Sequence, residues 1–244
     1  MLKWVAYPLS IIYYSIFMLL LWVFHPIQIV CLHLFGQRAQ NKAVNALNYL
    51  LLLALKIVGT RVVVSIQGKL PKDRLLIFAA NHQSTYDIPP LIWYLRKYSP
   101  KFIAKKELGK GFPSISYHLR NGGNVLIDRK EPAKSIAAIT QFCQQVQQLN
   151  EAVVIFPEGT RSRDGRIKPF QKAGLHSLLQ EIPKAMLVPV CIRNSWKLGQ
   201  WNYFPLPVGV NIELRVLPPI DPTLQTAKES IDQLERTIAN QLKN

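Results

Sequence analysis

Residues 75–87 read LLIFAANHQSTYD, an apolar run that ends on a polar cluster. The first six residues contain no turn former, a pattern typical of a buried strand in a parallel sheet. Asn81 and His82 end that run. Asp87 stands directly before an Ile-Pro-Pro sequence, and proline is tolerated in the first turn of a helix because the N–H groups there have no internal partner. We therefore expect Asp87 to be the N-cap of a helix that ends near residue 97.

His82 and Asp87 are five positions apart, which on a continuous helix would place them well off a common face. A strand end, a short turn and a helix start can instead bring the Asp87 carboxylate onto one imidazole nitrogen. That contact fixes the tautomer and leaves the other nitrogen free to accept a proton from a hydroxyl. Taken alone, the pair is more typical of a loop histidine beside a capping aspartate. Ser84 lacks the glycine elbow of a serine nucleophile, so we interpret it as a local hydrogen-bonding residue.

The composition fits one domain of moderate size with an attached segment. The chain has 244 residues, of which 49% are hydrophobic, and a formal net charge of +16. An excess of Lys and Arg attracts polyanions, which leaves nucleic acid, an anionic membrane surface and phosphorylated substrates as candidate partners. The basic residues form no recognisable recognition helix, so we expect no nucleic-acid partner. We also expect neither a disulfide framework nor a metal site, because the cysteines are few and scattered: Cys31, Cys143 and Cys191.

The amino-terminal segment carries no Asp, Glu, Lys or Arg between Trp4 and Gln37. As one helix it would reach roughly 50 Å, well beyond a hydrocarbon core of about 30 Å. His25-Pro26 divides the run, so we predict a bent or re-entrant pair of membrane-embedded helices that lie partly in one leaflet. A signal peptide would be shorter and would precede a small-residue cleavage site. With so basic a body, the positive-inside tendency predicts a membrane-bound protein whose catalytic domain lies on the cytoplasmic side.

Strands and helices alternate along the rest of the chain, which predicts an α/β fold with a mixed sheet flanked by helices. The expected strands cover residues 61–66, 75–80, 101–105, 124–129, 152–156, 186–192 and 208–217. The expected helices cover residues 87–97, 134–149, 171–180 and 226–243. Residues 43–58 are again largely apolar, and they fit either another membrane-facing helix or a helix packed on the domain. We therefore assign residues 1–58 to membrane-associated helices and residues 59–244 to a catalytic domain.

Three of the expected strands end on polar clusters, at His82 to Asp87, at Asp128-Arg129 and at Glu158 to Arg161. Ligands of parallel sheets gather outside the carboxyl ends of the strands, so these clusters predict a site. In the last cluster a guanidinium, a hydroxyl and a glycine suit phosphate binding, although a solvated basic loop is the alternative. The stretch lacks the Gly-Lys-Ser/Thr ending of a nucleotide P-loop. Lys105, at the end of a further strand, could converge with Arg129 on the same phosphate.

These clusters resemble, in their order, the motifs of the glycerolipid acyltransferases. Asn81 to Asp87 is similar to the His-x4-Asp motif of that family, and Phe156 to Arg163 is similar to its Phe-Pro-Glu-Gly-Thr-Arg-Ser block. Ile127 to Arg129, preceded by two glycines, resembles the block between them, and Val188 to Val190 resembles the last block. The four motifs occur in the family's order between residues 75 and 190. Through them the chain resembles, within that family, the 1-acyl-sn-glycerol-3-phosphate acyltransferases.

The resemblance implies a reaction and a set of site residues. His82 would be the general base and Asp87 the residue that orients it. The free sn-2 hydroxyl of lysophosphatidic acid would attack the thioester of acyl-CoA or acyl-carrier protein directly, giving phosphatidic acid without an acyl-enzyme or a further cofactor. The phosphorylated acceptor would be held by Lys105, Arg129, Glu158, Gly159, Thr160 and Arg161. The alternatives are an acyltransferase for another lysophospholipid or for glycerol 3-phosphate, and a non-catalytic basic protein of the anionic membrane surface.

Overall fold

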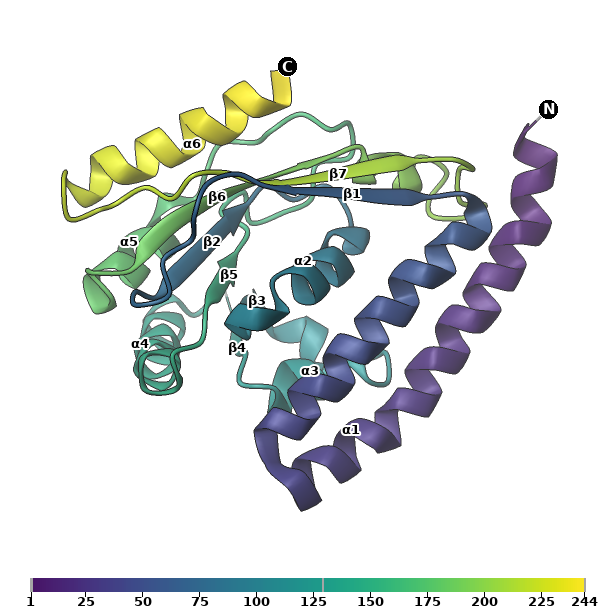
Figure 1. The fold of residues 1–244 in the computed structure, drawn as a ribbon, viewed down its shortest axis with the longest axis horizontal. Coiled ribbons are helices and arrows are strands. Elements are labelled where there is room, and N and C mark those ends of the chain that lie inside the picture. The colour runs from purple at the N-terminus through teal and green to yellow at the C-terminus, as the bar shows by residue number, and fades with distance from the viewer. Residues whose placement is uncertain (1, 129, 244) are drawn as a thin grey trace.

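A seven-stranded sheet forms the centre of the fold, in the order β1-β7-β6-β2-β5-β3-β4 (Figure 1). The computed structural model describes residues 2–128 and 130–243. The strands are β1 (Arg61–Ile66), β2 (Leu76–Ala80), β3 (Lys101–Lys105), β4 (Val125–Ile127), β5 (Val153–Ile155), β6 (Met186–Arg193) and β7 (Asn211–Val216). β7 runs antiparallel to β6 and parallel to β1, whereas the other neighbours are parallel. The predicted mixed sheet is therefore confirmed.

Helices cover both faces of this sheet. They are α1 (Leu2–Ala54), α2 (Ile88–Tyr94), α3 (Ile115–Asn121), α4 (Pro132–Leu149), α5 (Lys172–Glu181) and α6 (Ala227–Lys243), with 3₁₀ helices at Leu55–Val58, Thr85–Asp87, Arg96–Tyr98, Lys106–Gly109 and Ser195–Gly199. α1 and α2 pack on one face, where Leu52, Leu91 and Leu214 belong to one apolar cluster. α4, α5 and α6 pack on the other face, where Val146 and Leu234 belong to a second cluster. The central strands β2, β5 and β6 are thus buried on both sides.

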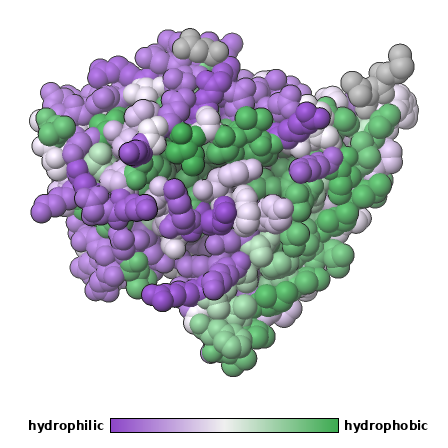
Figure 2. Space-filling view, viewed as in Figure 1, coloured by the Kyte–Doolittle hydropathy of each residue, from purple (hydrophilic) through white to green (hydrophobic). Residues whose placement is uncertain are grey.

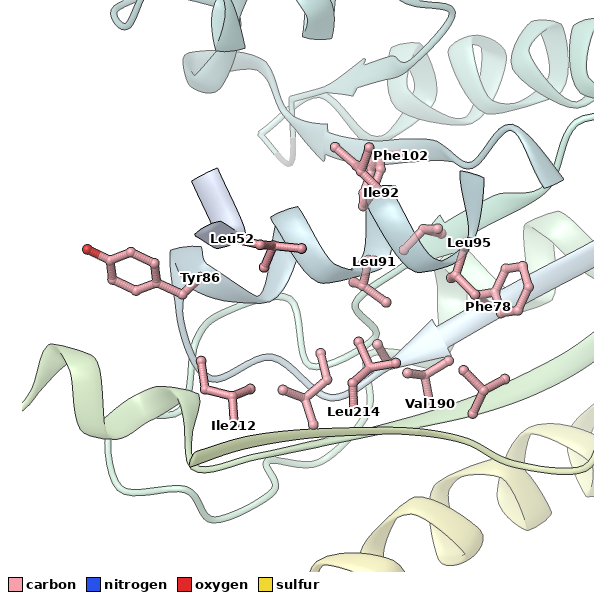
Figure 3. Packing of buried hydrophobic residues seen from close by; sticks show 14 of the residues in the cluster. Leu52, Phe78, Tyr86, Leu91, Ile92, Leu95, Phe102, Val190, Ile212 and Leu214 are labelled. Atoms are coloured by element: carbon pink, nitrogen blue, oxygen red, sulfur yellow. The ribbon is translucent and has the colours of Figure 1, made fainter. Parts of the chain in front are cut away.

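Strand β2 lies between β5 and β6 and is buried along its whole length. Its side chains alternate between the two apolar clusters, with Phe78 on the α2 side and Ile77 on the α4 side. Figure 3 shows Leu91 of α2 pointing toward the sheet, where Val190 of β6 lies beside β2. Each large side chain buried in this way stabilises the fold by roughly 1.5–3 kcal/mol. The central position of β2 brings the residues after Ala80 to the middle of the sheet's carboxyl edge.

Helix α1 consists of two arms that reverse direction at Gly36 (Figure 1). Gly36 has φ 76° and ψ −175°, a backbone conformation that glycine adopts without steric cost. The expected division at His25-Pro26 is therefore wrong, because the helix continues through Pro26. The arms pack together through Leu21 of the first and Leu47 of the second. The second arm also contributes buried residues to the cluster under α2, so residues 43–54 form a helix packed on the domain.

The first arm of α1, residues 2–35, exposes a broad apolar surface, visible in Figure 2 as a green band on the α1 side. Its exposed large side chains include Trp4, Val5, Ile11, Ile12, Leu19, Trp22, Val23, Ile27, Val30, Leu34 and Phe35. By length and composition, Lys3–Val58 is able to cross a membrane: an 18-residue window has mean hydropathy 2.1, and 11% of it is buried. Exposed apolar surface of this extent indicates membrane association. The boundary expected after residue 58 stays a prediction.

Candidate active site

The polar clusters that follow the strands meet at one edge of the sheet. β4, β3, β5, β2 and β6 are parallel neighbours, so their carboxyl ends point the same way. The segment from Asn81 to Asp87 follows β2, and the segment from Phe156 to Arg161 follows the adjacent β5. Lys105 ends β3 and is exposed. Arg129 lies outside the described residues, and its predicted role stays a prediction.

The His82 imidazole and the Asp87 carboxylate are in contact, with Nδ1 and Oδ2 2.8 Å apart. The same Oδ2 accepts the backbone N–H groups of Gln83 at 2.7 Å and Ser84 at 2.9 Å. The other oxygen, Oδ1, accepts the hydroxyl of Ser195. The Asp87 side chain is fully buried, so these donors fix its position. A carboxylate held in this way orients the imidazole and selects the tautomer with hydrogen on Nδ1.

Asp87 stands at the N-cap position of α2, as predicted, but it does not act as a capping side chain. Its side chain makes no capping bond to α2. A 3₁₀ turn, Thr85–Asp87, precedes α2 instead, and Ser84 is its N-cap: the Ser84 oxygen accepts the Tyr86 N–H at 3.3 Å. Asp87 completes this capping box from the third position, because a carboxylate there reaches back to the N-cap N–H. The turn directs the Asp87 side chain back to the strand end, and the expectation that Ser84 forms local hydrogen bonds is confirmed.

The backbone of His82 is held on both sides by the loop after β5. Its N–H donates to Glu158 Oε1 at 2.7 Å, and its carbonyl accepts the Ser162 N–H at 2.8 Å. The imidazole stacks on Phe156, with ring centroids 4.1 Å apart and an angle of 24° between planes. The side chain is 18% exposed. Among the described residues none forms a hydrogen bond with Nε2, so this nitrogen is available to a substrate that reaches the ring.

Glu158 is buried, and both of its carboxylate oxygens are occupied by backbone donors. Oε1 accepts the His82 N–H, and Oε2 accepts the Lys168 N–H at 2.9 Å. Burial raises the pKa of this carboxyl, while the two N–H donors act in the opposite direction. Through these two bonds Glu158 connects the segment after β2 to the loop after β5. Its predicted contact with the acceptor stays a prediction.

The next three residues of the β5 loop turn outward. Gly159 has φ 69°, a left-handed conformation that favours glycine, and its N–H donates to the Phe156 carbonyl at 3.0 Å. Thr160 and Arg161 are exposed. The Arg161 guanidinium donates to the hydroxyl of Tyr203 at 3.2 Å, which orients it along the surface beside the site. Thr160 and Arg161 are thus accessible to a phosphorylated ligand.

Two residues that contribute to this arrangement did not emerge from the sequence as site residues. Asn81 bonds β6 through its side chain: Nδ2 donates to the Ile192 carbonyl at 2.8 Å and Oδ1 accepts the Ile192 N–H at 2.6 Å. This amide continues the β2–β6 ladder at the point where the chain turns away. Ser195 supports Asp87 from a segment 108 positions away. The position of Asn81, a polar residue directly after an apolar strand, could have indicated its role from the sequence. Nothing in the sequence around Ser195 indicates its contact with Asp87.

Residues 61–193 match the sequence profile of the Acyltransferase family, and this segment is more than half of the chain. The chain therefore belongs to the Acyltransferase family. The matched segment contains His82, Asp87 and the whole β5 loop.

Several individual proteins similar to this chain share the name 1-acyl-sn-glycerol-3-phosphate acyltransferase. The 1-acyl-sn-glycerol-3-phosphate acyltransferase of Limnanthes douglasii is 32% identical over 165 residues, which cover 65% of this chain and 54% of the relative. The protein of the same name from Helicobacter pylori is 36% identical over 126 residues, 50% of either chain. This chain thus matches about half the length of these curated relatives. The crystal structure of the 1-acyl-sn-glycerophosphate acyltransferase from Thermotoga maritima has a TM-score of 0.68 at 23% identity, over 92% of this chain and 94% of that one, which confirms the fold.

Proposed function

We propose that this protein transfers an acyl chain from a thioester to the free sn-2 hydroxyl of 1-acyl-glycerol 3-phosphate, forming phosphatidic acid. The observation that carries the proposal is the His82–Asp87 pair, with Nδ1 bonded to Asp87 and Nε2 available. With hydrogen on Nδ1, Nε2 is the basic nitrogen and accepts the hydroxyl proton. The hydroxyl oxygen then forms the ester bond as the carbon–sulfur bond breaks, and the proton passes from Nε2 to the leaving thiolate. No acyl-enzyme is needed.

The exposed cations of the β5 loop support a phosphorylated acceptor. Arg161 and Arg163 are exposed, and the Lys168 ammonium donates to the Arg161 carbonyl at 2.9 Å. Guanidinium groups bind phosphate oxygens in bidentate fashion, and glycine backbone allows close approach. In this proposal Thr160 and Arg161 contact the phosphate, Gly159 shapes the loop, and Glu158 holds His82 in place. Lys105 and Arg129 would add charge from the neighbouring strand ends.

The choice of lysophosphatidic acid rests on the relatives, whose names specify 1-acyl-sn-glycerol 3-phosphate as acceptor. The donor in this proposal is acyl-CoA or acyl-carrier protein. The exposed apolar arm of α1 fits an acceptor that is itself a membrane lipid. The net charge of +16 suits an anionic membrane surface and, by the positive-inside tendency, a cytoplasmic catalytic domain.

Thioester consumption by the detergent-solubilised protein tests the proposal. The acceptors compared are lysophosphatidic acid, lysophospholipids with larger head groups and glycerol 3-phosphate. We expect turnover with lysophosphatidic acid and a loss of about 10²–10⁴-fold in His82→Ala, the usual contribution of a positioned acid–base group. The matched control is His176→Ala. His176 lies on α5, which packs with α4 and α6 on one face of the sheet, whereas His82 follows β2 at the carboxyl edge. The control variant should leave the rate unchanged.

The outcomes separate the alternatives. Near-normal turnover in His82→Ala would exclude His82 as the base. Preference for another acceptor would keep the chemistry and replace the substrate. Absence of transfer with either donor would favour a basic protein that binds anionic lipid by charge, whose binding high salt should remove because exposed charges are screened.

A further inference from the structure

A cavity of about 380 Å³ lies beside the candidate active site, between the loop after β5 and the end of α6. We call it the α6 pocket. Its wall includes Gln83, the residue after His82, together with Trp196 and Leu242. Its cationic residues are Arg166, Arg193 and Lys243, and Asp164 is the one carboxylate in its lining among the described residues. The volume falls in the range typical of small-molecule sites, about 300–1,000 Å³.

Hydrogen bonds connect the pocket wall to the catalytic pair. Gln83 Nε2 donates to the Gly165 carbonyl at 3.3 Å, and Gln83 Oε1 accepts the Ser195 hydroxyl at 3.4 Å. That same hydroxyl lies in contact with Asp87 Oδ1. The α6 pocket is therefore connected to the His82 imidazole through Gln83, Ser195 and Asp87, and Gln83 of its wall is also the residue that follows His82 in the chain.

The lining suits a ligand that is anionic at one end and uncharged along its length. The Arg166 side chain is 90% exposed, and its salt bridge to Asp164, 3.8 Å from Nε to Oδ2, leaves the terminal nitrogens of the guanidinium accessible to a phosphate. The Trp196 indole and Leu242 provide apolar wall. Gly165 lies directly against that indole: a Cβ there would be 2.4 Å from the indole nitrogen. This contact holds the ring in place.

The pocket and the proposed phosphate-binding arginine lie toward opposite faces of the sheet. Arg161 bonds to Tyr203, which packs against the cluster beneath α1 and α2. The pocket is lined by the end of α6, which covers the other face (Figure 1). A lipid acceptor would approach from the side of the apolar arm, and a water-soluble co-substrate from the α6 side. His82 follows the central strand between them.

We propose that the α6 pocket binds the phosphopantetheine arm of the thioester donor, with Arg166 and Lys243 on its phosphate and Trp196 against its uncharged chain. This arm is the chemistry shared by CoA and acyl-carrier protein. The inference rests on the proposed function and adds to it a binding site for the thioester donor. In this arrangement the thioester end of the arm extends past Gln83 to His82, where the acceptor hydroxyl meets it.

Equilibrium binding of CoA and of free 4′-phosphopantetheine, measured by calorimetry on the full chain in detergent, tests this assignment. We expect the double variant Arg166→Glu, Lys243→Glu to bind both ligands at least tenfold more weakly, because it replaces charge-assisted hydrogen bonds to the phosphate with repulsion. The KM of the donor should rise and that of the acceptor should not. The control is Lys228→Glu, an exposed lysine on the same helix about 22 Å from Lys243 along its axis.

Unchanged affinity for both ligands would overturn the assignment, even if transfer to lysophosphatidic acid is found. Weaker binding of CoA alone would place its nucleotide, not the arm, in the pocket and would also overturn it. Conversely, weaker binding of both ligands by a protein that does not acylate lysophosphatidic acid would support the pocket and reject the proposed acceptor. Comparing acyl-CoA with acyl-carrier protein as donors for the parent protein then identifies the source of the arm.

Discussion

Asp87 Oδ2 receives three donors at once, the imidazole of His82 and the backbone N–H groups of Gln83 and Ser84. Two of these bonds belong to the turn that begins α2, and the third reaches the proposed base. One side chain therefore joins the local backbone geometry to the orientation of the ring. A charged partner on Nδ1 also stabilises the imidazolium that forms when Nε2 takes a proton.

Replacing Asp87 with asparagine separates these two roles. The amide oxygen can still accept from the turn, but the side chain no longer carries the charge that stabilises the imidazolium. We expect kcat to fall by about 10²–10⁴-fold with little change in the acceptor KM. Steady-state transfer assays and thermal unfolding of Asp87→Asn measure both effects. The control is Asp73→Asn, which removes an exposed carboxylate from the loop before β2; an active Asp87→Asn protein of normal stability would remove the charge from the mechanism.

At the scale of elements, the strands are predictable where local pattern and tertiary environment agree. β2 is covered on both faces, and its uninterrupted apolar run predicts this directly. The sequence predicts the break in α1 at His25-Pro26, which is the wrong position. Pro26 is tolerated within the helix, whereas Gly36 takes the positive φ that the turn requires. The His82 and Glu158 positions follow from strand ends, but the Ser195 contact depends on chain segments far apart in sequence. No local periodicity encodes such a contact.

Helix α3 was not expected, because polar residues interrupt its pattern and face a buried polar cluster. His118 packs there near the Lys101 ammonium, which donates to the Gly122 carbonyl at 2.7 Å and lies 3.3 Å from Glu151 Oε1. Burial, together with the charge of Lys101, lowers the pKa of His118 to about 3. In the unfolded chain a histidine has a pKa near 6.5. The unfolded state therefore binds more protons between about pH 6.5 and pH 3.

This difference predicts a loss of stability in acid. The free energy of unfolding should fall as the pH drops below about 6.5, at up to about 1.4 kcal/mol per pH unit from this one group. His118→Gln cannot titrate and should flatten that part of the curve. Denaturant unfolding in detergent at pH 7 and pH 5 measures the difference, and comparison with the parent protein cancels the contribution of Glu151. His176→Gln is the control; identical pH dependence of parent and His118→Gln would refute the prediction.

At the scale of the whole molecule, the apolar arm of α1 is joined to the loop that orients Arg161. The Ser10 hydroxyl accepts the Leu206 N–H at 2.8 Å, and the Tyr14 hydroxyl donates to the Tyr203 carbonyl at 2.5 Å. The Tyr203 hydroxyl in turn accepts from Arg161. The exposed apolar arm and the residues proposed to hold the lipid phosphate are therefore linked by hydrogen bonds. This placement keeps the proposed acceptor site close to the bilayer.

Membrane binding should depend on the tip of the α1 hairpin, where Leu34 and Phe35 are 71% and 70% exposed. A charged side chain in the hydrocarbon core costs about 2.5–3.5 kcal/mol, so Leu34→Asp with Phe35→Asp should weaken binding to phosphatidylcholine vesicles by more than about 10²-fold. Leu149→Asp is the control, because Leu149 is an exposed leucine at the end of α4, away from the hairpin. Vesicle sedimentation at low and high salt measures the change. Because neutral lipid and high salt remove the contribution of the net charge, a loss that persists there must come from insertion of the tip. Equal sedimentation of the tip variant and the control would show that another part of the chain holds the membrane.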